Sequence, residues 1–551
     1  MTQHPSRHRH RRRAALAAAV ALSLTLLAGC AGTGSTSAGA DAGPTEGGDA
    51  VFLINSLGTS WVPNESSISS YQGNIWGQVT DKLVYVDDSG AVSPWIAESW
   101  DQNADATAFT LHLEEGVTFS DGTALDAAAV VTNLDYWAFG APDKGITPIG
   151  LFPKTYQKAT AVDAQTVEVT FSAPTLGFIP TLGYHGSILV SPKTLALSKE
   201  EQGDLDNFSG SGPFTIRSWA DGDDVVLAKR ADYTWGPGAI GHTGAPYLDT
   251  LTYKQVAESS TRIGALTSDQ AQVIYNIQPS ELAGLTDRGY EVGLPRYLGF
   301  TNGYRVNVTA APFDDVRVRQ ALQHGIDRRQ ILDTVYTDGW QAAQGLIQSN
   351  VPEATDHSAD FAFDADKAAA LLDEAGWVPG ADGKRTKNGQ PLAVTLYANP
   401  YLATSASIDE LVAQQLGTLG FTVTVQTYDV ATFGEKVKND STTPLYEITR
   451  SFIDVGTVAS ILTSANKGED WFGLGETDPT LNDLRDRIAR ATDLDTRAAA
   501  VDELQTYVLQ QGLFVPITQI VQRIYVQSPK LQGVTYNGVA IAGYAAAYLQ
   551  K

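Results

Sequence analysis

Apolar side chains occupy every second position in two short stretches of the first half of the chain. The stretches are 109–113 and 167–171, and polar residues fill the intervening positions. Side chains that alternate with a period of two line one face of a strand. The pattern therefore predicts two half-buried strands.

A helical period appears elsewhere. Apolar residues at 130, 134 and 137 share one helix face, and Ser407 with Glu410 forms a capping-box pattern ahead of an apolar stripe. Gly420 can end that second helix, and residues 421–425 then alternate as a strand. Helix-to-strand units between about 360 and 430 indicate an α/β fold, and the first half is richer in strands.

Length and charge narrow the class of protein. The chain has 551 residues, 43% of them hydrophobic and 18% charged. This composition is typical of a globular protein, and the length predicts two to four packed units. The formal net charge of −24 disfavours binding to nucleic acid or anionic lipid.

The first 30 residues indicate export. A basic head (7–13) precedes an apolar run (14–27) that is too short for a comfortable membrane span. The residues Leu-Ala-Gly-Cys at 27–30 resemble a bacterial lipobox, and Cys30 is the single cysteine of the chain. We therefore expect a signal peptide over 1–29 and lipid attachment at Cys30. An ordinary signal peptide is the alternative, and both Sec and twin-arginine export remain open.

No motif of covalent chemistry stands out. The sequence has no His-Glu-x-x-His, Gly-x-Ser-x-Gly or Walker-type Gly-x-x-x-x-Gly-Lys. A Gly-x-Gly-x-x-Gly at 236–241 contains Pro237 and lies in a turn-rich stretch, so it predicts a loop. The histidines after the signal segment do not share metal-ligand spacing. These absences favour a protein without a cofactor or metal site.

Four segments in order carry a resemblance to a known family. They read FSDGTALDA at 119–127, GSGPFTI at 210–216, PFDDVRVRQAL at 312–322 and DADKA at 364–368. Together they resemble extracytoplasmic solute-binding proteins of ABC importers, family 5, the peptide/nickel-binding type. Locally, they read as turns and helix caps that build the scaffold. Asp314 or Asp315 can cap one helix, Asp327 shortly after the third segment can cap a second, and Asp364 can begin a third.

The resemblance implies an α/β fold of the two-lobed periplasmic-binding-protein-like kind, class II type, with an extra strand-rich subdomain in the first lobe. It also implies the following division of the chain: a flexible tether at 30–48, lobe I at 49–297, lobe II at 298–507 and a return to lobe I at 508–551. The two crossings are expected near 300–307 and 504–516. Lobe closure would bury a solute and present it to an ABC permease and its ATPase subunits. This role needs no covalent chemistry, so the resemblance implies that the protein is not an enzyme. The protein would then be a monomer on the outer face of the cell membrane.

The resemblance also suggests solute contacts after a central strand. In peptide-binding members an aspartate there pairs with the peptide's amino terminus, and Asp454 falls on that position within 450–457. Val455 replaces an aromatic residue and the usual proline is absent. A role as a solvated acid or as a partner of Arg450 is the alternative for Asp454. We expect Asp454→Ala to weaken binding and to leave the stability of the ligand-free protein nearly unchanged.

Other candidate ligand contacts come from the expected family layout. These ligand-binding candidates are Arg450, Phe452, Tyr275, Asn276, Trp340 and Asn307. Flat rings can cover a solute and amides can orient it, although core packing is the commoner role of a large aromatic residue. For Asn307, on the expected crossing strand, simple edge exposure is the alternative.

Peptides or peptide-like amines are the leading solute class from the sequence. Nickel chelates, oligosaccharides and opine-like compounds remain open within the same fold. Two other classes are a secreted lipid-anchored hydrolase, for which no nucleophile motif is present, and a sensor or adhesin that never meets a permease.

Overall fold

The computed structural model describes residues 43–67, 71–150, 152–336, 339–400, 402, 404–439, 445–448, 450–456, 478–521 and 523–550. The elements below belong to one unit, Pro44–Lys551. The predicted signal peptide and Cys30 lie outside the described residues. None of the helices in the described part of the chain has the length and apolarity that a membrane span requires.

A seven-stranded sheet gathers strands from both ends of the chain. Its central strand β1 runs parallel to β10 and β11, and the remaining pairings are antiparallel. β1 is nearly all apolar, as expected for a strand covered on both faces. In spatial order the strands are β12 (Glu291–Gly293), β21 (Tyr525–Gln527), β11 (Val273–Tyr275), β1 (Asp49–Ile54), β10 (Thr250–Gln255), β9 (Asp224–Lys229) and β8 (Phe214–Ala220).

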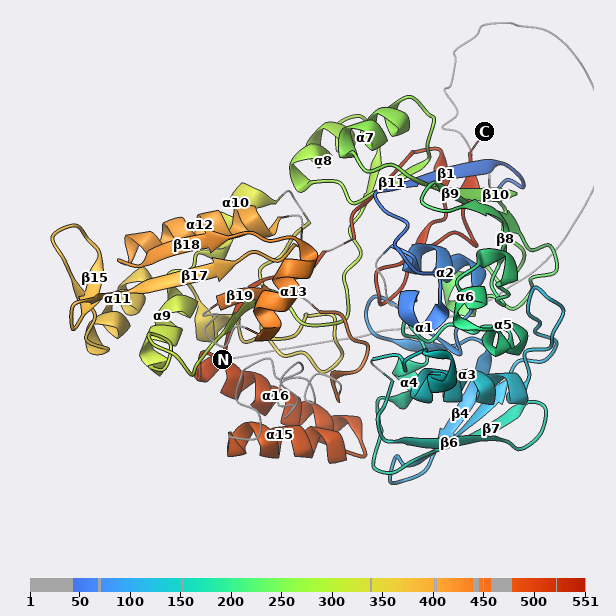
Figure 1. The fold of residues 1–551 in the computed structure, drawn as a ribbon, viewed down its shortest axis with the longest axis horizontal. Helices are drawn as coiled ribbons and strands as arrows, with labels where there is room; N and C mark the ends of the chain where they lie inside the picture. Colours follow the sequence, from blue (N-terminus) through green and yellow to red (C-terminus); the bar gives the residue numbers. More distant parts are fainter. Residues whose placement is uncertain are drawn as a thin grey trace, which may run out of the picture. The chain divides into compact units, whose positions relative to one another are not determined.

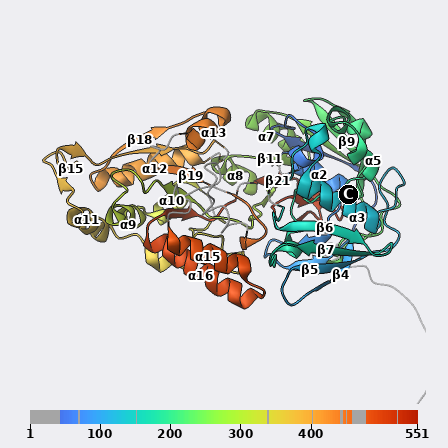
Figure 2. The same cartoon turned by 60° about the horizontal axis from the view of Figure 1, so that its bottom comes forward.

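An antiparallel four-stranded sheet confirms the two alternating stretches. Its order is β4 (Ala97–Gln102), β5 (Ala108–Leu113), β7 (Thr166–Phe171) and β6 (Tyr156–Ala161). The predicted helix at 130–137 is α3 (Ala127–Phe139), which Asp126 caps through a bond from the Ala129 amide. α3 packs against this sheet (Figure 2). We call the part built on these first two sheets lobe I.

Short elements complete lobe I. The helices are α1 (Pro63–Ser66), α2 (Gly73–Val79), α4 (Phe178–Thr181), α5 (Pro192–Ala196), α6 (Lys199–Gln202), α7 (Ser259–Thr267) and α8 (Pro279–Thr286). The paired short strands are β2 (Val84–Val86) with β3 (Val92–Pro94), β22 (Leu531–Gln532) with β25 (Tyr548–Leu549), and β23 (Thr535–Tyr536) with β24 (Ala542–Gly543). The stretch at 236–241 contains a short 3₁₀ turn, Gly238–Ile240, so the predicted loop is confirmed.

Lobe II is built on a five-stranded sheet. Its order is β18 (Thr422–Gln426), β17 (Ala393–Tyr397), β19 (Leu445–Ile448), β13 (Asn302–Val306) and β20 (Phe514–Thr518). β17 is parallel to both of its neighbours, and β13 is antiparallel to both of its own. In Figure 1, α12 lies alongside strand β18 of this sheet, and α15 and α16 lie side by side.

The remaining described elements of lobe II surround the sheet. The helices are α9 (Val316–Gly325), α10 (Arg328–Val335), α11 (Ala365–Glu374), α12 (Ser405–Thr418), α13 (Val430–Asn439), α15 (Pro479–Arg490) and α16 (Leu494–Gln510). A small sheet joins β14 (Val378–Pro379), β15 (Arg385–Lys387) and β16 (Gln390–Pro391).

The family-like segments form the predicted helix caps. Asp315, Asp327 and Asp364 are the N-caps of α9, α10 and α11, and each side chain accepts a backbone amide hydrogen bond. The predicted capping box of Ser407 with Glu410 is wrong, because α12 begins at Ser405 with no side-chain cap. The Ser405 hydroxyl instead donates to the buried carboxyl group of Glu447, and the helix starts three residues earlier than the capping box predicts.

The chain passes between the two large sheets at two places. The first passage lies between β12 and β13, at 294–301, and includes the expected boundary of 297/298. The return was expected at residue 508, but β20 still pairs with β13 in lobe II. The next strand, β21, pairs with β11 in lobe I. The second passage is therefore the segment between β20 and β21, at 519–524.

Two buried carboxyl groups lie under the sheet of lobe II. Burial raises the pKa of Asp409 to about 7. Burial and the neighbouring Asp409 raise the pKa of Glu447 well above its usual range. The Tyr304 hydroxyl donates to Asp409, and Asn302 Nδ2 donates to Glu447 at 2.7 Å. The pair therefore retains protons that the unfolded chain releases.

This pair makes stability depend on pH. The native state binds more protons than the unfolded state between about pH 4 and 7, so unfolding free energy falls as pH rises through that window. We expect Asp409→Asn to reduce the loss of melting temperature between pH 5 and pH 8, measured by calorimetry. The control is Glu410→Gln, an exposed position on the same helix. An unchanged pH slope in Asp409→Asn would contradict the assignment.

Candidate functional site

Backbone pairing brings the loop after β19 against the first passage between the lobes. The Phe300 amide donates to the Arg450 carbonyl at 3.0 Å, and the Phe452 amide donates to the Leu298 carbonyl at 2.9 Å. Gly299 pairs with Ser451 between these bonds. A Cβ on Gly299 would lie 2.4 Å from the Arg450 carbonyl oxygen, so this close approach requires glycine.

A group of aromatic residues surrounds one arginine at this place. We call it the junction cluster, and it consists of Tyr184, Tyr275, Tyr297, Arg523 and Tyr525. The Tyr275 and Tyr525 ring centroids are 5.1 Å apart, and the Arg523 guanidinium lies 5.0 Å from the centre of the Tyr297 ring. All five side chains are buried. The cluster draws on both passages, the end of β11 and the loop after α4.

The electrostatics of the cluster follow from burial and from Arg523. Burial raises the pKa of each tyrosine, and the Arg523 charge lowers it in all four. Burial lowers the pKa of Arg523, but the four tyrosines together raise that pKa above its ordinary value. The tyrosine hydroxyls therefore keep their protons and can donate hydrogen bonds.

The loop of lobe II reaches this cluster through Tyr184. Burial raises the pKa of Tyr184. The Arg450 charge and a hydrogen bond with Ser451 both lower it. Tyr184 belongs to lobe I, and Arg450 and Ser451 belong to lobe II. A molecule held between the lobes here would touch residues of both.

Asp454 has a different partner from the one considered in the sequence. Arg497 on α16 donates from Nη1 to Asp454 Oδ1 at 2.6 Å and from Nη2 to Glu353. Only 9% of Asp454 and 4% of Arg497 are exposed, so the three residues form a buried ion triad. The Gly456 amide donates to Asp454 Oδ2 at 2.9 Å.

Lobe I closes over the Asp454 carboxyl group. A Cβ on Gly177 would lie 2.0 Å from Asp454 Cγ, so glycine at the start of α4 admits the carboxyl. One apolar core also continues from the four-stranded sheet to Phe452 and Val455 in lobe II. The loop after β19 therefore packs between the lobes.

The other predicted contacts lie either in the junction cluster or in apolar cores. Tyr275 belongs to the junction cluster. Arg450 lies near the same cluster, where its charge lowers the pKa of Tyr184 and so opposes the effect of burial. Phe452 packs edge-on against Phe300, with ring centroids 5.2 Å apart. Trp340 stacks on Tyr336 at 5.2 Å and joins a core with residues of lobe I.

The two asparagines have backbone-directed roles. Asn276 has a φ of 59°, and its carbonyl accepts from Arg262 Nη2 at 2.9 Å. Asn307 Oδ1 accepts from the amide of Thr309 at 3.0 Å and from its hydroxyl at 2.7 Å.

Sequence reasoning missed the arginine of the cluster. Arg523 is the single charged residue in the largely apolar stretch from 513 to 526, which is a signal that could have found it. Tyr184, Tyr297 and Tyr525 carry no such signal, because buried tyrosines are common in cores.

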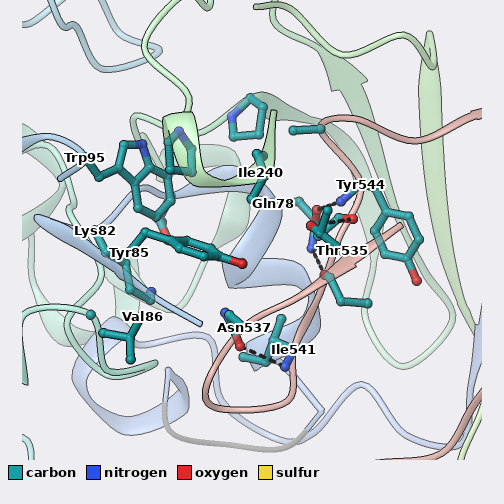
Figure 3. A pocket seen from close by; sticks show the side chains of 18 of the residues that line it. Gln78, Lys82, Tyr85, Val86, Trp95, Ile240, Thr535, Asn537, Ile541 and Tyr544 are labelled. Atoms are coloured by element: carbon teal, nitrogen blue, oxygen red, sulfur yellow. Dashed lines mark hydrogen bonds between the residues drawn. The ribbon is translucent and has the colours of Figure 1, made fainter. Parts of the chain in front are cut away.

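A separate small pocket lies within lobe I. Its volume is about 70 Å³, and Lys82, Tyr85, Trp95 and Asn537 are among its lining residues (Figure 3). Pockets for drug-sized ligands are typically about 300–1,000 Å³. Burial lowers the pKa of Lys82 to about 7. The turn of the β23–β24 hairpin separates this pocket from Arg523, which donates to the Val539 carbonyl.

A larger hollow lies at the surface. It has a volume of about 420 Å³ and is lined by residues of α8, α10 and α12 and by Thr404. Its walls are mostly polar. Within the described ranges, no group of three or more acidic, histidine or cysteine side chains is placed to hold a metal ion.

Two sheets joined by two chain passages, with a buried aromatic and charged junction between them, define a two-lobed solute-binding protein. A sequence profile of bacterial extracellular solute-binding proteins, family 5, matches residues 91–466. The chain therefore belongs to this family. Its members serve ABC importers as binding proteins and are not enzymes, so the family and the non-enzymatic class predicted from the sequence are confirmed.

Individual relatives agree with this placement. The chain is 30% identical over 393 residues to the glutathione-binding protein GsiB of Pectobacterium atrosepticum. This match covers 69% of each of the two chains. In the Escherichia coli K12 form of GsiB, the match spans 60% of the relative's length.

Solved structures support the two-lobed fold. NikA from Brucella suis, in complex with Fe(III)-EDTA, has a TM-score of 0.76 and 24% identity, and the match covers 91% of this chain and 100% of NikA. DppA from Helicobacter pylori, in complex with the peptide STSA, has a TM-score of 0.72 and 19% identity, and the match covers 92% of this chain and 99% of DppA.

The buried triad yields a stability prediction. We expect Arg497→Leu to lower the unfolding free energy by about 3–5 kcal/mol, because two buried carboxylates lose their shared cation. The control is Arg329→Leu, which removes an exposed ion pair with Asp333 and should cost less than about 1 kcal/mol. Urea unfolding of both variants measures the difference, and equal effects would show that the triad is not a stabilising unit.

The same geometry changes the expectation for Asp454. Because Asp454 is an ion partner of Arg497, its removal should also cost stability in the ligand-free protein, in contrast to the small effect expected from the sequence.

Proposed function

We propose that this protein is a lipid-anchored receptor that binds a peptide or peptide-like solute between its lobes and delivers it to an ABC import permease. The observation that carries the proposal is the junction between the lobes, where residues of both lobes meet around buried aromatic rings. Closure onto a solute would be stabilised by contacts with both lobes at once.

The triad supports the choice of a peptide-like amine. Two carboxylates share one guanidinium, so Asp454, Glu353 and Arg497 together carry one formal negative charge. A buried negative charge attracts an ammonium group strongly once water leaves. Asp454 Oδ2, which accepts one backbone hydrogen bond, would face the solute's amino group.

The relatives support the same class and keep one alternative. The names of two similar proteins refer to a small peptide, glutathione in GsiB and the peptide STSA in DppA. NikA was solved with Fe(III)-EDTA, so a metal chelate is the second candidate solute.

Thermal unfolding with ligand pools tests the solute class. The full chain in mild detergent is melted alone and with pools of dipeptides, tripeptides including glutathione, oligosaccharides and Fe(III)-EDTA. A ligand that binds only the folded form adds about 2.7 kcal/mol at 100 times its Kd. We expect a raised melting temperature with a peptide pool. Free amino acids at equal concentration are the control, and a shift with the chelate or oligosaccharides alone would refute the peptide proposal.

Metabolic labelling tests the anchor. We expect cells given an alkyne-bearing fatty acid to transfer it to the chain and to hold the chain in the membrane fraction, because the thiol of Cys30 follows a lipobox-like sequence. Cys30→Ala should lose both properties, with Ser35→Ala as the matched control. Label that persists in Cys30→Ala would exclude lipidation at Cys30.

A further inference from the structure

Arg523 is a buried cation without an acidic partner. Its side chain is 1% exposed, and no ion pair joins it to any carboxylate in the described part of the chain. A buried charge is costly unless another group compensates it. Something besides the described acidic side chains must therefore offset this charge.

The hydrogen bonds of Arg523 leave capacity to spare. Nη1 donates to the Val539 carbonyl, and a hydrogen bond to Arg523 lowers the pKa of Tyr275, which burial raises. Nε is buried and has no partner among the described atoms. A guanidinium has five N–H donors in a planar fork.

Two other buried arginines have more partners than Arg523. Arg497 binds two carboxylates, and Arg328 donates to four backbone carbonyls, although Arg497 Nε and Arg328 Nη2 also have no partner among the described atoms. Both of these arginines join elements of the scaffold. Arg523 differs in kind, since tyrosine rings and hydroxyls form most of its surroundings.

The position of Arg523 connects it with a solute between the lobes. It lies in the second passage, between β20 of lobe II and β21 of lobe I. Tyr297 of the first passage covers it, and Tyr184 extends the cluster to Arg450 and Ser451 of lobe II. A solute that bridges the lobes at the junction cluster would meet the guanidinium there.

We propose that Arg523 is a specificity-determining residue, and that the solute carries a carboxylate which accepts hydrogen bonds from its guanidinium. The fork of a guanidinium matches the two oxygens of a carboxylate. This inference rests on the proposed function and narrows its solute class. With the net negative triad of Asp454, the junction offers charges of both signs, which suits a zwitterion.

The test compares matched probes. The full chain is titrated calorimetrically with the dipeptide and tripeptide pools, with the same pools amidated at the carboxyl terminus, and with Fe(III)-EDTA. Melting experiments compare sodium formate with sodium chloride at equal ionic strength. Formamide at the same concentration is the uncharged control. We expect free-carboxylate probes to bind and amidated pools to bind at least about thirtyfold more weakly, as loss of one partner of a buried charge pair implies.

Variants separate Arg523 from general effects. Arg523→Gln should bring the free pool down to the affinity of the amidated pool and abolish stabilisation by formate. Arg523→Lys should keep a preference for carboxylates, which sustains the test if Arg523→Gln does not fold. Arg329→Gln, an exposed arginine of lobe II, is the charge-matched control and should behave as wild type.

The outcomes distinguish the two proposals. If Fe(III)-EDTA binds and requires Arg523 while peptides do not bind, the carboxylate inference stands and the peptide proposal fails. If peptides bind equally well when amidated, or equally well to Arg523→Gln, the inference is overturned and the proposed function stands. Absence of any shift, with formate included, overturns the inference as well.

Discussion

The chain passes twice between two separate sheets, and this constraint organises everything else in the structure. The passages at 294–301 and 519–524 lie next to each other, because β13 and β20 are neighbours in one sheet and β21 borders β11 and β12 in the other. Residues far apart in sequence therefore meet between the lobes. The loop after β19 is drawn to the same place by its backbone pairing with 298–300.

Buried charge is handled in three different ways. Asp409 and Glu447 retain protons, because burial raises the pKa of both groups and no cation is paired with either in the described structure. Arg497 stays charged between two carboxylates. Arg523 stays charged among tyrosines. The first two solutions neutralise or pair the buried charge within the scaffold, whereas Arg523 has no carboxylate partner among the described residues.

The net charge of the chain affects how these buried charges interact with a solute. With a net charge of −24, the protein as a whole repels anions. The proposed recognition of a carboxylate would therefore depend on a cation that burial shields from the remaining charge. In water a guanidinium at the surface of such a protein would be screened, but in a low-dielectric junction its field is strong.

Local sequence patterns predicted local structure well. The strands β5 and β7, the helix α3 and the caps at Asp315, Asp327 and Asp364 depend on neighbours within a few residues, so periodicity and capping chemistry suffice. The family also followed from the sequence, because its scaffold segments are local turns and helix starts. The failed capping box at Ser407 marks the limit, since the buried Glu447, 42 residues from Ser405, decided where that helix begins.

The site depended on tertiary structure. The sequence pointed to the loop containing Asp454 and to Tyr275, but it could not assign Arg497, which is 43 residues away, as the partner of Asp454. It also gave no reason to join Tyr184, Tyr297 and Arg523, which lie on different segments. Local patterns report which face of an element is buried, and only the packing of the two sheets decides which buried groups meet.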